Sequence, residues 1–105
     1  MPDRFYEKLL NDVTKIVIFF STESGQVSRF VVKLLFLLNN EWKEVQRYDC
    51  YHDGVHKDVY NLKGIKIRQK RFELVDIPSG LTMAIEDFTE NYESIIWRYL
   101  YDKKI

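Results

Sequence analysis

The pattern of apolar and polar residues divides the chain into a strand-rich part followed by one long helix. Residues 13–20 are mostly β-branched or aromatic, a composition that favours a β-strand. Residues 27–38 carry apolar side chains at both odd and even positions, which is typical of a strand covered on both faces. Turns are expected at the Ser-Gly pair 24–25 and the Asn-Asn pair 39–40, because glycine and asparagine accept positive φ angles. The two runs therefore predict neighbouring strands joined by a hairpin.

Further strands are expected after this hairpin, and a short helix before it. Three segments mix apolar and polar residues as short strands do, at 41–48, 57–61 and 65–74. The N-terminal segment begins with Asp3, a good helix-capping residue, and carries Phe5, Leu9 and Leu10 at a rough helical spacing. We therefore predict a short helix over residues 3–10 and a sheet of four to five strands.

The C-terminal third of the chain has the period of an amphipathic helix. Its apolar residues recur every three or four positions, at Leu81, Ile85, Phe88, Tyr92, Ile95 and Tyr99. Ser79, next to Pro78, is the predicted N-cap, and Trp97 is expected in the core beside the stripe. Such a helix must bury its stripe, and the sheet offers the surface for it. The predicted fold is α+β, an antiparallel sheet packed by a long C-terminal helix.

Composition and charge restrict the setting rather than the function. The 105 residues include two prolines, four glycines and no linker, so we expect one domain over 1–105. The single cysteine, Cys50, favours a reducing compartment. Because the chain shows neither a leader nor an apolar run of ~20 residues, we predict a cytoplasmic protein without membrane contact.

The net charge of zero predicts no polyanion partner, although basic residues dominate 57–71 and acidic residues dominate 72–93. These charge runs mark either a binding face or two solvated surfaces.

Candidate chemistry is concentrated in the polar segment between Arg47 and Asp58. Both histidines of the chain, His52 and His56, lie there, with Asp49 before them and Asp58 after them. Histidine transfers protons near neutral pH, and an adjacent carboxylate orients its ring. An arginine stabilises an anion such as phosphate. The segment therefore permits a metal-independent nuclease site that needs no cofactor, with the histidines as acid and base.

Two other interpretations of the same segment stay open. His52 and His56, with either Asp49 or Asp58, offer the nitrogen and oxygen donors of a divalent metal site. Alternatively, the Asp-Gly pair at 53–54 is only a hairpin turn and the histidines are exposed bystanders.

The segment also resembles a pattern found in small prokaryotic domains. Its residues run from Glu41 through Trp42, Val45, Arg47, Tyr48 and Asp49 to His52, His56 and Asp58. This is similar to W-x-x-V-x-R-Y-D-x-x-H-G-x-x-H-x-D, a pattern of an uncharacterised domain family and of TumE-like toxins, which pair with a small antitoxin. In this chain Asp53 follows the first histidine and the glycine comes one position later, at Gly54. The resemblance implies a toxin–antitoxin role and a signature site of Arg47, Tyr48, Asp49, His52, His56 and Asp58.

Two hypotheses follow from the sequence. The first is a toxin-like ribonuclease, in which Arg47 and Tyr48 contact the substrate and the basic strand with Lys66 and Arg68 guides RNA by phosphate contacts. The second is a non-enzymatic protein-binding module, such as an antitoxin, immunity or accessory protein. Its contact surface would be the acidic helix face or an open sheet edge, towards a cognate protein or a second copy in a homodimer.

Overall fold

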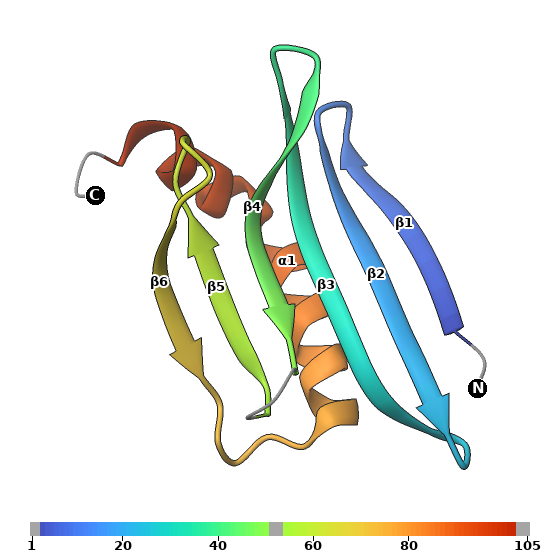
Figure 1. The fold of residues 1–105 in the computed structure, drawn as a ribbon. Coiled ribbons are helices and arrows are strands. Elements are labelled where there is room, and N and C mark those ends of the chain that lie inside the picture. Colours follow the sequence, from blue (N-terminus) through green and yellow to red (C-terminus); the bar gives the residue numbers. More distant parts are fainter. Residues whose placement is uncertain (1–2, 51–53, 103–105) are drawn as a thin grey trace.

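Consecutive strands of the chain pair in the order in which they occur, so the sheet is a meander. The computed structural model describes residues 3–50 and 54–102, and within them six strands form one antiparallel sheet in the order β1-β2-β3-β4-β5-β6 (Figure 1). The strands are β1 (Asp3–Asn11), β2 (Thr14–Glu23), β3 (Gln26–Leu38), β4 (Glu41–Asp49), β5 (His56–Tyr60) and β6 (Lys66–Arg71). One helix, α1 (Ile77–Tyr101), lies across a single face of this sheet. The predicted α+β class is confirmed, with more strands than expected.

The predicted N-terminal helix is wrong, because this segment is the edge strand β1. β2 offers backbone partners along nearly the whole segment, in pairs such as Phe5 with Phe19 and Leu9 with Lys15. Asp3 accepts a hydrogen bond from the hydroxyl of Ser21 at 2.6 Å instead of capping a helix. A short isolated helix has little stability in water, so the hydrogen bonds to β2 determine the conformation of this segment.

Two hairpin turns match the sequence expectation. Ser24 and Gly25 have φ angles of 54° and 80°, and Asn39 and Asn40 have φ angles of 53° and 65°. Positive φ at both central residues is the turn geometry that follows the right-handed twist of paired strands. These turns set the register of β2 with β3 and of β3 with β4.

The core lies between α1 and one face of the central strands. On β3 the side chains of Phe30, Val32 and Leu34 are buried against the helix residues Ala84 and Phe88. The alternate positions of β3, including Val31 and Lys33, are half-buried on the opposite face. No described element covers that opposite face, which we call the open face (Figure 1). The expectation that β3 is covered on both faces is therefore wrong.

The helix begins earlier than predicted and turns one aromatic residue outward. Asp76, not Ser79, is the N-cap, because its carboxylate accepts a hydrogen bond from the Ser79 backbone N–H at 2.8 Å. The predicted stripe is otherwise confirmed, with Leu81, Phe88, Ile95 and Tyr99 buried and Ile85 and Tyr92 partly buried. Trp97 is 62% exposed and its ring packs on that of Tyr101 along the helix, so its predicted place in the core is wrong. Within the described ranges no helix is long and apolar enough to cross a membrane.

Candidate functional site

The pairing of β4 with β5 brings four of the sequence-predicted site residues together. Asp49 lies opposite His56, and Arg47 lies opposite Asp58. Side chains two residues apart on a strand point to the same face of a sheet. All four side chains therefore lie on one face, and because Tyr48 between them packs on α1, that face is the open face.

The imidazole of His56 is held between oxygen atoms on both sides. Its Nε2 lies 2.8 Å from Asp49 Oδ1 and 3.8 Å from Asp58 Oδ2. Its Nδ1 lies 3.3 Å from the carbonyl oxygen of Gly54. Since carboxylate and carbonyl oxygens only accept hydrogen bonds, this arrangement suits a ring that donates from both nitrogens. The ring is thus oriented from two sides at the start of β5.

The two carboxylates of the site are buried although no helix among the described residues covers them. Asp49 is 8% exposed and Asp58 is 3% exposed. Asp58 accepts a hydrogen bond from the side-chain amide of Gln69 at 2.9 Å and lies 3.5 Å from Lys66 Nζ. Buried charges require such partners, because burial without them carries a large desolvation cost. Strand β6 therefore holds Asp58 in place.

The guanidinium of Arg47 connects Asp49 to a further acidic residue, Glu44. Arg47 Nη1 lies 4.0 Å from Asp49 Oδ2, and Arg47 Nε lies 2.8 Å from Glu44 Oε2. In a regular strand, residues 44 and 47 would point to opposite faces. A bulge at Val45 of β4 changes this, because Gln46 pairs with Leu34 and Glu44 pairs with Leu35, so both side chains reach the open face. The sequence did not indicate Glu44, because no residue pattern in β4 reveals that bulge.

Tyr60 is a second site residue that the sequence did not indicate. It follows His56 and Asp58 at alternate positions of β5 and so shares their face. Burial raises the pKa of its phenol, and the charge of Glu44 raises it further. The alternation of His56, Asp58 and Tyr60 would have found it, had the strand been predicted to begin at His56.

Two predicted residues do not join this cluster, and a third, His52, lies outside the described residues. The hydroxyl of Tyr48 donates to Asp87 Oδ2 of the helix at 2.7 Å, on the other face of the sheet. Arg68 also turns towards the helix side, whereas Lys66 reaches the site. Of the predicted residues, the structure thus brings together Arg47, Asp49, His56, Asp58 and Lys66.

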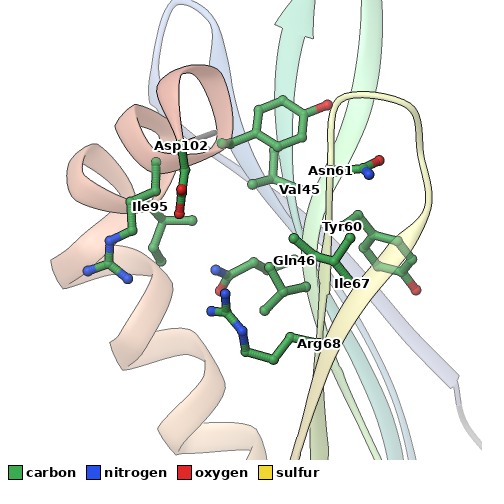
Figure 2. Close-up of a pocket in the computed structure, with 11 residues that line it drawn as sticks. Val45, Gln46, Tyr60, Asn61, Ile67, Arg68, Ile95 and Asp102 are labelled. Carbon is green, nitrogen blue, oxygen red and sulfur yellow. The ribbon is translucent and has the colours of Figure 1, made fainter. Parts of the chain in front are cut away.

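Arg68 belongs instead to a cavity between the sheet and the C-terminal half of α1. Figure 2 shows the side chains of Gln46 and Arg68 directed into this space, with Ile95 on the helix facing them. Gln46 is buried, and its Oε1 has no hydrogen-bond partner among the described residues. His56 and the two aspartates lie on the opposite side of the sheet, so the cavity is separate from the candidate site.

Three residues of the cluster have the composition of a metal site. Asp49, His56 and Asp58 each present one donor atom, and these atoms lie within 4.8 Å of one another. Imidazole and carboxylate donors suit zinc, manganese or iron. A metal-binding histidine usually donates its other N–H to a carbonyl or carboxylate, as His56 does to Gly54. Among the described residues the donors are one histidine and both aspartates, whereas the predicted ligand His52 lies outside those residues.

Fold and site together define a small α+β protein with a histidine–carboxylate cluster on an open antiparallel sheet. The chain belongs to the family described as Domain of unknown function (DUF7718), whose model matches residues 1–105. Comparison with curated proteins found no match. Comparison with solved structures found none either.

Proposed function

We propose that this chain cleaves phosphodiester bonds, as a toxin-like ribonuclease of a prokaryotic toxin–antitoxin system that acts in the cytoplasm. The observation that carries the proposal is the placement of His56 Nε2 at 2.8 Å from Asp49 Oδ1, with Arg47 at 4.0 Å from the same carboxylate. A carboxylate, an imidazole and a guanidinium are the base, the acid and the anion-binding group that such a reaction uses.

The cleavage step assigns a role to each of the three groups. The 2′-oxygen of the ribose forms a bond to phosphorus, while the bond from phosphorus to the 5′-oxygen of the next nucleotide breaks. The carboxylate of Asp49 takes the proton of the 2′-hydroxyl, and His56 gives a proton to the departing 5′-oxygen. Arg47 stabilises the negative charge that builds up on the phosphoryl oxygens. Asp58, held by Gln69 and Lys66, positions the His56 ring.

The test is cleavage of a labelled single-stranded RNA by purified protein in the presence of EDTA. We expect His56→Gln and Asp49→Asn to lower the cleavage rate by about 10²-fold or more, the range typical of a lost acid or base. Trp97→Ala, on the outer surface of the helix, serves as the matched control and keeps full activity. Full activity in both site variants would end the proposal. An inactive wild type that forms a stoichiometric complex with a host protein would favour the protein-binding module instead.

A metal-assisted form of the same reaction is the second candidate. It is favoured by the convergence of Asp49, His56 and Asp58 within 4.8 Å and by the contact of His56 Nδ1 with Gly54. A divalent ion there would supply charge stabilisation and an activated water. Loss of cleavage in EDTA, restored by added Mn²⁺ or Zn²⁺ in the wild type and not in Asp58→Asn, would establish this form. Cleavage that is unchanged by EDTA would establish the metal-independent form.

A further inference from the structure

The open face of the sheet carries an apolar region in line with the candidate site. The strand registers pair Phe5 with Phe19, Phe19 with Val31, Val31 with Asp49, and Asp49 with His56. These five residues therefore form one row across β1 to β5, because paired residues in an antiparallel sheet point to the same face. The apolar half of the row and the site lie side by side on one surface.

The neighbouring row makes the two halves continuous. It pairs Val17 with Lys33 and Lys33 with Arg47. A shallow depression on the open face is lined by Phe5, Val17, Phe19, Val31, Lys33 and Arg47. Arg47 thus borders both this depression and the histidine–carboxylate cluster. Lys33 forms no ion pair with any residue in the described ranges.

We propose, resting on the proposed ribonuclease function, that the substrate is single-stranded RNA whose bases stack on this apolar depression while Lys33 and Arg47 contact its phosphates. Phe5 is 61% exposed and Phe19 is half-buried, so both rings are accessible from the open face. Bases of an unpaired strand stack on aromatic side chains with little sequence preference, and neighbouring cations follow the backbone. A duplex keeps its bases stacked inside and has no face to offer Phe5 and Phe19.

The same row of residues also explains how a bound RNA strand would extend from the apolar depression to His56. From Phe19 on β2 to His56 on β5 the sheet is crossed by three strand steps of ~4.8 Å each. An RNA segment of a few nucleotides therefore spans the distance from the apolar depression to His56. Its phosphates pass Lys33 and Arg47, which lie in the row beside that path.

The experiment measures binding separately from cleavage, with His56→Gln as the background to prevent turnover. The probes are a labelled single-stranded RNA of mixed sequence, an abasic strand of the same length, and an RNA duplex. Phe5→Ala and Phe19→Ala are expected to weaken binding of the single strand about tenfold each. Neither change should affect the abasic strand. Phe19→Tyr keeps the ring and should restore binding, and Trp97→Ala is the control for an exposed aromatic residue elsewhere.

The outcomes separate this inference from the proposed function. Cleavage by the wild type together with unchanged binding in Phe5→Ala and Phe19→Ala would overturn the stacking site alone. Equal binding of the abasic strand, or preference for the duplex, would overturn it as well. A wild type that neither binds nor cleaves RNA would overturn both proposals. Loss of self-association in Phe5→Ala without any effect on RNA would assign the depression to a second copy of the chain and overturn the stacking site.

Discussion

The hydroxyl of Tyr48 donates a hydrogen bond of 2.7 Å to the carboxylate of Asp87, which ties β4 to α1 directly behind the candidate site. Asp87 also lies 3.2 Å from Lys57 Nζ and accepts a hydrogen bond from Asn91. Arg47 and Asp49 flank Tyr48 on the other face, so this contact fixes the strand that carries them. It links the stability of the fold to the geometry of the site.

Removing the Tyr48 hydroxyl should therefore destabilise the protein without removing a site residue. Hydrogen bonds to charged groups contribute about 1.5–3 kcal/mol, and we expect Tyr48→Phe to lower the free energy of unfolding by an amount in this range. Urea denaturation followed by circular dichroism measures the change. Tyr101→Phe, which alters an exposed tyrosine of α1, is the control. An unchanged midpoint in Tyr48→Phe would show that the Tyr48–Asp87 contact does not support the fold.

Asp87 should make stability depend on pH in the acid range. Burial opposes its ionisation, but the hydrogen bonds from Tyr48 and Asn91 and the charge of Lys57 lower its pKa below the ordinary 3.8. A carboxyl with a lowered folded pKa stabilises the fold above its unfolded value, and this contribution is lost as pH falls through the folded pKa. Asp87→Asn should therefore be less stable than the wild type at pH 6, with the difference shrinking below pH 3.8. A difference that is the same at pH 6 and pH 2 would contradict this account.

Tyr48 should have the opposite effect in alkali. Burial and the neighbouring Asp87 carboxylate raise the pKa of its phenol above 10.0. The stabilisation is complete below pH 10.0, the unfolded value, and is lost as pH rises above it. We expect the wild type to lose stability above pH 10 more steeply than Tyr48→Phe, as measured by urea midpoints between pH 8 and pH 11. If the urea midpoints of the two proteins fall in parallel with pH, the raised pKa of Tyr48 does not contribute to stability.

Gly80 lets the first turn of α1 approach the start of β5 closely. A Cβ at this position would lie 2.6 Å from Val55 Cγ2, next to His56. Gly80→Ala should therefore destabilise the protein by about 1–3 kcal/mol through overpacking, despite the better helix propensity of alanine. Adding Val55→Ala should relieve part of this cost. If Gly80→Ala is more stable than the wild type in thermal unfolding, the close contact is not restrictive.

Lys66 and Arg68 are two residues apart on β6 but lie on opposite faces, because the register with β5 is irregular between them. They therefore provide a matched pair of variants for activity measurements. Lys66 Nζ lies 3.5 Å from Asp58, whereas Arg68 lines the cavity under α1. We expect Lys66→Gln to lower RNA cleavage several-fold, because Asp58 loses its cation, and Arg68→Gln to leave it unchanged. Rates at substrate concentrations well below saturation measure the effect. The reverse ranking would place the active surface on the helix side of the sheet.

The sequence indicated most of the fold because its local signals and its tertiary partners agree. The stripe from Leu81 to Tyr99 has the helical period and the sheet buries it, so this helix is confirmed. Residues 3–10 carry only a weak helical pattern, and they form a strand because they pair with the edge of β2. Trp97 lies just outside the buried stripe, and which flank of a stripe faces solvent depends on where the sheet lies.

For the candidate site, the sequence predicted the types of residue that are present but not how they are arranged in space. The sequence alone predicted Arg47, Asp49, His56, Asp58 and Lys66 as candidates, since histidine, carboxylate and basic side chains are recognisable wherever they fall. The bulge in β4 decided that Glu44 joins them, and the register of the strands decided that Tyr48 and Arg68 do not. The face to which a side chain points alternates with each residue, and a single bulge reverses it. Local sequence therefore determines which chemical groups are present, and only the pairing of distant strands determines which of them meet.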